Sequence, residues 1–194
     1  MSEGPRRTKG VHTGPRSRRV VESVQAATMR ELVRVGYARM TVGSVAAEAG
    51  VARTTIYRRW PTKADLVASL LEPQFARFDA AAPAGTLAEE LTRLIRVIAV
   101  NLMSPEGQAI VLVLNSPLPE LKALVAQSRE RAMALFVRAF HDAEGRGELP
   151  HGVDVEMLVH LAFVGGVQWV TLRERAPTDE ECARLVRAVL ASVP

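Results

Sequence analysis

Hydrogen-bond donors and aromatic side chains are concentrated in one short segment, residues 51–63, with the sequence VARTTIYRRWPTK. Arginine can bind guanine through two parallel hydrogen bonds, and a threonine methyl group can contact the methyl group of thymine. The side chains suited to such contacts are Arg53, Thr54, Thr55, Tyr57, Arg58 and Arg59. Only Val51 and Ile56 are plainly suited to a hydrophobic core. The segment therefore indicates a surface that binds nucleic acid.

The spacing of three small or apolar residues predicts the element that carries this surface. Ala46, Gly50 and Ile56 stand at the positions where a helix-turn-helix needs a small residue, a turn glycine with positive φ, and an inward apolar side chain. A recognition helix over about residues 53–59 would then lie in the major groove. An ordinary αα-hairpin with a solvated basic face fits the spacing alone equally well. The composition of the exposed face favours the first interpretation.

Residues around this helix are suited to the DNA backbone. Tyr57 and Lys63 are placed for phosphates, and Thr62 begins a helix whose free N–H groups favour an anion. Thr41 is the expected N-cap of the helix that precedes the turn, and we include it in the predicted interface. Three arginines before the first helix, at positions 16, 18 and 19, could reach a minor groove. A solvated tail is the alternative for them.

Charge and composition separate two parts of the chain. Residues 1–79 carry 14 Lys and Arg against 7 Asp and Glu, whereas residues 80–194 carry 11 against 14. The basic excess of the first part indicates a polyanionic partner, with solubility as the simpler explanation. Cys182 is the only cysteine, so neither an intramolecular disulfide nor a cysteine-based zinc cluster is available. We found neither a secretory signal nor a membrane-length apolar run, and a cytoplasmic protein without membrane partners is the expectation.

Hydrophobic periodicity predicts an all-α protein with about nine helices. We expect a flexible basic arm over residues 1–16, a three-helix DNA-binding domain over 17–79 and a helical bundle over 80–194. The sequence AAAPAG at residues 80–85 marks the boundary. Thr86 with Glu89, and Thr178 with Glu181, predict capping boxes at two helix starts. Pro73 should bend or restart the fourth helix.

Residues 40–71, MTVGSVAAEAGVARTTIYRRWPTKADLVASLL, resemble the DNA-binding signature of the tetracycline-repressor (TetR) family of bacterial transcription regulators. The resemblance covers about residues 17–71. It implies a homodimer on double-stranded DNA with a palindromic operator, and a C-terminal domain for dimerisation and for a small-molecule effector. Two positions depart from the family pattern: Ala52 replaces a capping serine, and Trp60 replaces the usual phenylalanine. Gly43, a poor helix former, has no explanation in the sequence.

The resemblance also implies that the middle and last helices of the second part carry the effector site and the dimer interface. Apolar and amide side chains there are candidate effector contacts, although core packing explains each of them as well: Asn101, Met103, Asn115, Phe136, Phe140, Phe163, Gln168 and Trp169. Gly165 and Gly166 within a helix suggest the close approach of another helix, and a void beside a ligand is the alternative. The predicted dimer interface comprises Gly165, Gly166, Leu185 and Val189.

Other functions have weaker support in the sequence. Glu156 and His160 have the spacing of a metal-ligand pair, but the remaining histidines offer no second pair, so we predict no metal and no cofactor. We found no phosphate-binding loop and no motif of paired catalytic residues, which argues against an enzyme. The predicted function is a ligand-responsive repressor. A transcriptional activator and a non-specific architectural DNA-binding protein are the alternatives.

Overall fold

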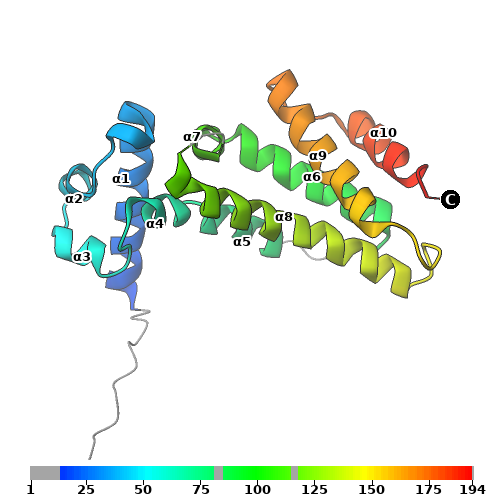
Figure 1. Ribbon diagram of the computed structural model, residues 1–194, viewed down its shortest axis with the longest axis horizontal. Helices are drawn as coiled ribbons and strands as arrows, with labels where there is room; N and C mark the ends of the chain where they lie inside the picture. The colour runs from blue at the N-terminus through cyan, green and yellow to red at the C-terminus, as the bar shows by residue number, and fades with distance from the viewer. Residues whose placement is uncertain (1–13, 81–84, 115–117, 194) are drawn as a thin grey trace, which may run out of the picture. The chain divides into compact units, whose positions relative to one another are not determined.

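The computed structural model describes residues 14–80, 85–114 and 118–193 (Figure 1). These residues form helices α1 to α10 and contain no strand, which confirms the predicted all-α fold class. Tertiary contacts divide the chain into two units, the first ending at Lys63 and the second beginning at Ala64. The expected arm at residues 1–16 lies outside the described residues up to position 13. Pro15 and Arg16 belong to the first helix rather than to an arm.

The first unit contains α1 (Pro15–Arg39), α2 (Val42–Ala49) and α3 (Arg53–Tyr57), shown in blue to cyan in Figure 1. α1 begins two residues before the predicted start because Pro15, at the first helical position, lacks the N–H that would have no partner there. Gly36, with φ 72° and ψ 165°, interrupts the helix three residues before its end. α2 packs against both α1 and α3. This packing fixes the short α3 on the longer helices.

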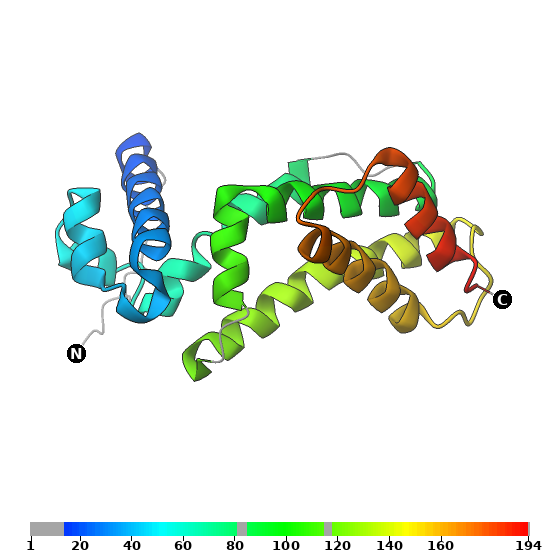
Figure 2. The same cartoon turned by 90° about the horizontal axis from the view of Figure 1, so that it is seen from above.

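The second unit contains seven helices among the described residues: α4 (Lys63–Ala68), α5 (Glu72–Ala80), α6 (Leu87–Met103), α7 (Pro105–Leu114), α8 (Pro119–Gly145), α9 (Val155–Arg173) and α10 (Asp179–Leu190). α6 packs against α8, α9 and α10, and the last two lie side by side (Figure 2). The largest fully buried side chains of the unit include Leu91, Leu94, Ile95, Phe136 and Phe140. This core accounts for the apolar stripes seen in the sequence.

The helix starts of the second unit follow the predicted signals. The capping boxes of Thr86 with Glu89 and of Thr178 with Glu181 are both present. Pro73 lies in the first turn of α5, so the chain ends α4 at Ala68 and restarts at Glu72. The expected domain boundary at residues 80–85 falls between α5 and α6, and residues 81–84 lie outside the described part of the chain.

By length and composition α9 passes the criterion for a helix that could cross a membrane, contrary to the expectation from the sequence. Glu156 is the only charged residue between Val155 and Leu172, which keeps the mean hydropathy of this stretch at 1.5. Core helices of soluble proteins meet the same criterion. In this chain 28% of the stretch is buried, and several of its large apolar side chains are exposed.

Candidate nucleic-acid interface and effector cavity

The turn between α2 and α3 has the geometry that the sequence predicted. Ala46 is 3% exposed, and Gly50 adopts the left-handed conformation with φ 66° and ψ 33°. A side chain would strain the backbone at this glycine. Ile56 is completely buried. These three residues hold α3 so that its other side chains face away from the core.

The exposed side of α3 carries most of the predicted DNA-contacting residues. Arg53, Thr54, Tyr57 and Arg58 are exposed, and Thr55 is half-buried. α3 ends at Tyr57, two residues before the predicted end, and Arg58 and Arg59 continue as a turn. Ala52 caps α3 without a side-chain hydrogen bond, as expected for alanine. Trp60, the second departure from the family pattern, is buried.

Arg53 lies across α2 at Gly43. A Cβ atom built on Gly43 would come within 2.7 Å of a terminal nitrogen of the Arg53 guanidinium and 3.0 Å of its Cζ atom. Gly43, which the sequence alone did not explain, thus lies next to the guanidinium group of Arg53.

Two other predicted contact residues are hydrogen-bonded within the first unit. The Arg59 guanidinium donates to the Ser17 hydroxyl near the start of α1. The Lys63 ammonium donates to the carbonyl oxygens of Tyr37, at 2.9 Å, and Ala38, at 3.3 Å. It also lies 4.2 Å from the centre of the Tyr37 ring. Arg59 and Lys63 therefore connect the region around α3 to α1. Thr62, the remaining predicted contact residue between them, is exposed.

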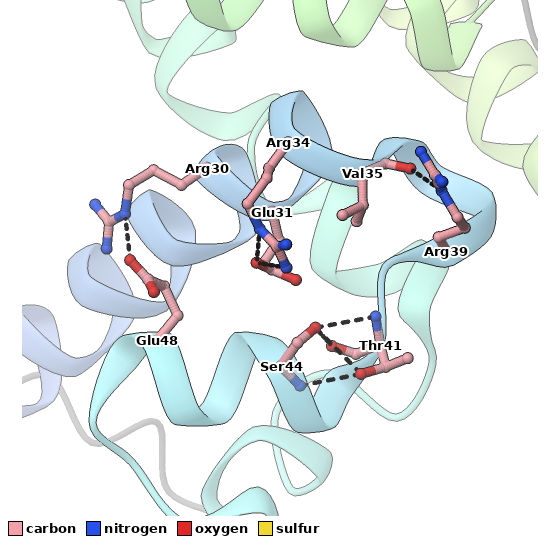
Figure 3. Close-up of polar contacts among 8 residues, drawn as sticks. All are labelled: Arg30, Glu31, Arg34, Val35, Arg39, Thr41, Ser44 and Glu48. Atoms are coloured by element: carbon pink, nitrogen blue, oxygen red, sulfur yellow. Dashed lines mark hydrogen bonds and ion pairs between the residues drawn. The ribbon is translucent and has the colours of Figure 1, made fainter.

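Figure 3 shows polar contacts within α1, at the start of α2 and between the two helices. Arg30 on α1 pairs with Glu48 on α2 at 2.7 Å. Glu31, which is almost fully buried, accepts from Arg34 at 2.6 Å and 2.8 Å. The nearby Ser44 side chain and the Arg34 guanidinium hold the pKa of Glu31 below its usual value. Sequence reasoning missed these residues, although the i, i+3 spacing of Glu31 and Arg34 signals their pairing.

Thr41 begins α2 through a capping box with Ser44 (Figure 3). The Ser44 amide donates to the Thr41 hydroxyl at 3.0 Å, and the Thr41 amide donates to the Ser44 hydroxyl at 3.2 Å. The Ser44 hydroxyl donates in turn to the Thr41 carbonyl oxygen at 2.9 Å. The predicted N-cap role of Thr41 is confirmed, and its side chain remains exposed.

The second unit contains a cavity of about 510 Å³. It is lined by Leu71 and by residues of α5, α6, α7, α8 and α9. Of the predicted effector contacts, Asn101, Phe163 and Gln168 line this cavity. Met103, Phe136, Phe140 and Trp169 are not among its lining residues, and Asn115 lies outside the described residues. Phe136 and Phe140 are completely buried, so the alternative of core packing accounts for them.

Asn101 is 5% exposed and joins α5 to α6. Its side-chain oxygen accepts from Arg77 at 2.9 Å, and its side-chain nitrogen donates to the Gln74 carbonyl oxygen at 3.3 Å. Sequence reasoning missed other polar lining residues, namely Gln74, Ser128, Arg129 and Thr171. Gln74 and Ser128 lie within otherwise apolar helical patterns. That irregularity is the signal that could have identified them.

The two glycines of α9 have neighbours within their own chain. A Cβ atom on Gly165 would lie 3.1 Å from a methyl carbon of Leu185 on α10, and one on Gly166 would lie 3.4 Å from Ile95 on α6. Gly166 is buried, and Val189 is 3% exposed. Close packing of α9 on α6 and α10 therefore explains these glycines within one subunit, where we had expected the helix of a partner.

The side chains considered as possible metal ligands, His160 and Glu156, and the single cysteine, Cys182, do not form a metal site. The His160 ring interacts with the Glu156 carbonyl oxygen at 2.8 Å, on an exposed part of α9. Within the described ranges, no three His, Cys, Asp or Glu residues form a group that could hold a metal. Cys182 is completely buried, and burial raises the pKa of its thiol. Cys182 therefore acts as a small core residue of α10.

A helix-turn-helix with an exposed basic face, followed by a helical unit with a mostly apolar cavity, defines the class of two-domain DNA-binding regulators. Residues 25–70 match the model of bacterial regulatory proteins of the tetR family, and residues 81–189 match the tetracyclin repressor-like C-terminal domain. The chain belongs to the TetR family and is a DNA-binding transcriptional regulator. The family and its relatives are named as regulators rather than as enzymes.

Curated relatives and solved structures agree with this family. An uncharacterized HTH-type transcriptional regulator of Mycobacterium tuberculosis is 34% identical over 168 residues, 85% of this chain and 83% of the relative. The DNA-binding transcriptional repressor TetR of Mycobacteroides abscessus is 30% identical, over 73% of this chain and 80% of the relative.

The fold resembles that of Salmonella enterica GusR, with a TM-score of 0.72 and 16% identity, over 95% of this chain and 99% of that one. It also resembles Bacillus subtilis FadR in complex with stearoyl-CoA, with a TM-score of 0.61 and 21% identity, over 88% and 95% of the two chains. These two likenesses concern the fold.

Proposed function

We propose that this regulator is a repressor that binds a palindromic operator as a homodimer and is released from it by a small molecule. The observation that carries the proposal is the buried Ile56, which leaves the basic and polar side chains of α3 exposed. A two-fold symmetric dimer presents two such helices to half-sites roughly 34–36 Å apart, about one turn of DNA. Because the proposed binding partner is DNA, we assign the protein to the cytoplasm.

The residues of the interface divide into two roles. Arg53, Thr54, Thr55, Tyr57 and Arg58 lie on or directly after α3 and are assigned to base edges and neighbouring phosphates. Contacts with the DNA backbone are assigned to Thr41, Arg59, Thr62 and Lys63. Arg59 and Lys63 are already fixed to α1 by hydrogen bonds, which reduces the conformational entropy that their positioning would cost on binding.

The proposed dimer interface is the exposed side of α9. Met157, Leu161, Val164 and Leu172 are 42–79% exposed and follow a helical spacing of four, three and eight residues. They therefore lie along one stripe of the helix, and Gln168 occupies the same stripe. A second copy of this chain is the occupant to which we assign the stripe, because a symmetric pair of α9 helices would remove both stripes from water. Gly165 and Leu185 lie beside it.

The effector site is assigned to the cavity of the second unit. Its volume lies within the range of about 300–1,000 Å³ that is typical of small-molecule sites. α5 contributes Gln74 and Phe75 to the lining, and α4 immediately precedes α5 in the chain. A ligand in the cavity can therefore act on α4. To release DNA, the ligand must bind the DNA-incompetent form more tightly than the competent form.

Selection of binding sites from random duplexes tests the DNA-binding part of the proposal. The purified protein is expected to enrich one palindrome, with two half-sites separated by about one helical turn. Equal affinity for all duplexes would instead support a non-specific architectural role. A reporter gene placed behind the selected palindrome then separates the two regulatory outcomes. Lower expression in the presence of the regulator supports repression, and higher expression identifies an activator.

The dimer interface is tested by sedimentation of the purified protein. Leu161→Glu places a charge in the middle of the exposed stripe, and we expect the variant to sediment as a folded monomer. Val100→Glu is the matched control, because Val100 is an exposed valine on α6. A Leu161→Glu variant that remains a dimer would contradict the assignment of α9.

A further inference from the structure

The polar lining of the cavity has a consistent chemical bias. Its polar residues are Gln74, Asn101, Ser128, Arg129, Gln168 and Thr171. The lining contains no Asp or Glu among the described residues, and its one charged side chain is the cation Arg129. The apolar part is larger and includes Leu71, Phe75, Ile98, Val111, Phe163 and Val167. Such a site favours an apolar ligand and discriminates against a positive charge.

One hydrogen-bond donor in this lining is unpaired. The side-chain nitrogen of Gln74 is buried and has no hydrogen-bond partner among the described residues. Neighbouring Asn101 differs, because its amide group is engaged with Arg77 and with the Gln74 backbone. A buried donor without a partner is unfavourable, so a ligand gains affinity by supplying an acceptor oxygen to Gln74. Gln74 thus provides a recognition group that Asn101 does not.

Arg129 supplies a positive charge to the same lining. It is exposed on α8, and within the described part of the chain it forms no ion pair or hydrogen bond. The guanidinium is permanently charged, and its planar donors match a carboxylate through two parallel hydrogen bonds. Arg131, two residues further along α8, is by contrast paired with Glu72 at 2.9 Å. Arg129 is therefore available to an anionic ligand group.

We propose that the effector is an apolar carboxylate, whose negative end is bound by Arg129 and which offers a further acceptor oxygen to Gln74. This proposal rests on the effector role assigned above to the cavity. The ligand class is an apolar body that carries one carboxylate. An ionised carboxylate has about four acceptor sites, so in a simple fatty or aryl acid the same group can bind Arg129 and also accept a hydrogen bond from Gln74.

Three probes of equal length test the ligand class by titration calorimetry on the full chain without DNA: decanoate, decanamide and decylamine. Decanoate is expected to bind about tenfold more tightly than decanamide, because the guanidinium contact is lost in the amide. Decylamine is expected not to bind. Comparable affinity for decylamine and decanoate, or failure of decanoate to bind, would overturn the proposed class.

Two substitutions assign the contacts. Arg129→Met is expected to equalise the affinities for decanoate and decanamide, and Gln74→Leu to weaken both. Arg138→Met is the matched control, since Arg138 is an exposed arginine on the same helix that does not line the cavity. A preference for decanoate that persists in Arg129→Met would contradict the role of Arg129. If decanoate binds but leaves the operator complex intact, the proposed release mechanism fails while the ligand class stands.

A second observation, independent of the cavity, concerns Gly43. Glycine within a helix costs up to about 1 kcal/mol relative to alanine, so its presence in α2 needs a specific reason. The Arg53 guanidinium occupies the space that a Cβ atom of residue 43 would need. We infer that Gly43 is a positioning residue, whose missing side chain lets Arg53 lie across α2 in the orientation used for DNA. This inference rests on the proposed role of Arg53.

Gly43→Ala tests this inference, because a purely structural role and a positioning role predict different outcomes. Thermal stability is expected to stay equal or rise, since alanine favours the helix, while operator affinity falls about tenfold. In an Arg53→Ala background, Gly43→Ala should leave affinity unchanged. Gly145→Ala is the control, since a Cβ atom there meets no atom within 4 Å.

Wild-type affinity in Gly43→Ala, or an equal loss in the Arg53→Ala background, would overturn the positioning role. If Arg53→Ala alone retains full operator affinity, the proposed reading role of Arg53 fails, whatever the effect at Gly43.

Discussion

The face of α3 and the cavity of the second unit use polar side chains in opposite ways. On α3 and directly after it, Arg53, Tyr57 and Arg58 are exposed, and the neighbouring cations Arg59 and Lys63 are hydrogen-bonded to α1. In the cavity, a few amide and hydroxyl groups lie among apolar side chains, and the buried Gln74 nitrogen has no partner among the described residues. The first surface is exposed and positively charged, whereas the second is mostly apolar.

This difference indicates how each site obtains its selectivity. Exposed cations attract any duplex over a distance of about a Debye length, so sequence selectivity has to come from accurately positioned base contacts. In the cavity a ligand that fails to pair a buried donor loses affinity, so selectivity comes from matching hydrogen bonds. We therefore expect salt to weaken DNA binding strongly and effector binding much less.

The largest effect is expected from removing the support of α3. Ile56→Ala deletes completely buried atoms and should lower the free energy of unfolding by about 2–5 kcal/mol. Operator binding should be lost, while the cavity should still bind its ligand. Denaturant unfolding and calorimetry measure the two properties. Val33→Ala, at a position 69% exposed on α1, should change stability by no more than about 0.5 kcal/mol.

Removal of one base contact should have a smaller and purely functional effect. Arg53→Ala is expected to lower operator affinity by about 10- to 100-fold, which corresponds to about 1.4–2.8 kcal/mol, without changing the helix content. Fluorescence anisotropy with the selected palindrome measures this loss. Arg138→Ala removes the same charge from an exposed site on α8 and should retain affinity within about twofold. Equal affinities of the two variants would contradict specific reading by Arg53.

A serine at the start of α3 should strengthen the DNA-binding unit slightly. Ala52 caps α3 without a side-chain hydrogen bond, and serine would supply one to the first turn. Ala52→Ser is therefore expected to raise the free energy of unfolding by up to about 1 kcal/mol. Thermal unfolding monitored by circular dichroism is the measurement. A lower melting temperature would show that α3 begins in another way.

The smallest effect concerns a surface cap in the second unit. Hydrogen bonds from Arg175 and from the Thr178 amide lower the pKa of Glu181 from 4.5 to about 2. Because the folded-state pKa is depressed, ionised Glu181 stabilises the fold fully above about pH 4.5, and this contribution is lost as the pH falls towards 2.

Glu181→Gln should therefore be less stable than the wild type at neutral pH and lose less stability on acidification. Glu180→Gln, at an exposed neighbouring position, serves as the control. Identical acid profiles for Glu181→Gln and the wild type would contradict this account.

Local spacing predicted the first unit well and the cavity poorly, for a physical reason. Ala46, Gly50 and Ile56 act through contacts within about ten residues of the chain, so their types and spacing are visible in the sequence. The cavity combines Gln74, Ser128 and Gln168, which are brought together only by packing of α5, α8 and α9. Of the residues proposed from the sequence as effector contacts, Asn101, Phe163 and Gln168 line the cavity. Phe136 and Phe140, which the sequence does not distinguish from Phe163, are completely buried in the core.

Contacts between residues far apart in the sequence explain two further differences between the sequence prediction and the structure. Arg59 appeared free for DNA, but its guanidinium binds Ser17, which is 42 positions away. Gly43 had no explanation until Arg53, ten residues later, was found beside it. Gly43 and Arg53 lie on separate helices, and Arg59 lies in the turn after α3, so no helical periodicity connects the members of either pair. The sequence identified Arg59 and Arg53 as candidate DNA contacts. Their neighbours Ser17 and Gly43 could be identified only from the folded structure.

The central claim is that exposed side chains of α3, held by the buried Ile56, read the base pairs of a duplex. The most direct test is selection from random DNA with the wild type and with Arg53→Gln in parallel. Since arginine pairs best with guanine and glutamine with adenine, the variant should change its preference at one symmetry-related position in each half-site and keep the others. Identical preferred sequences for the two proteins would contradict the claim.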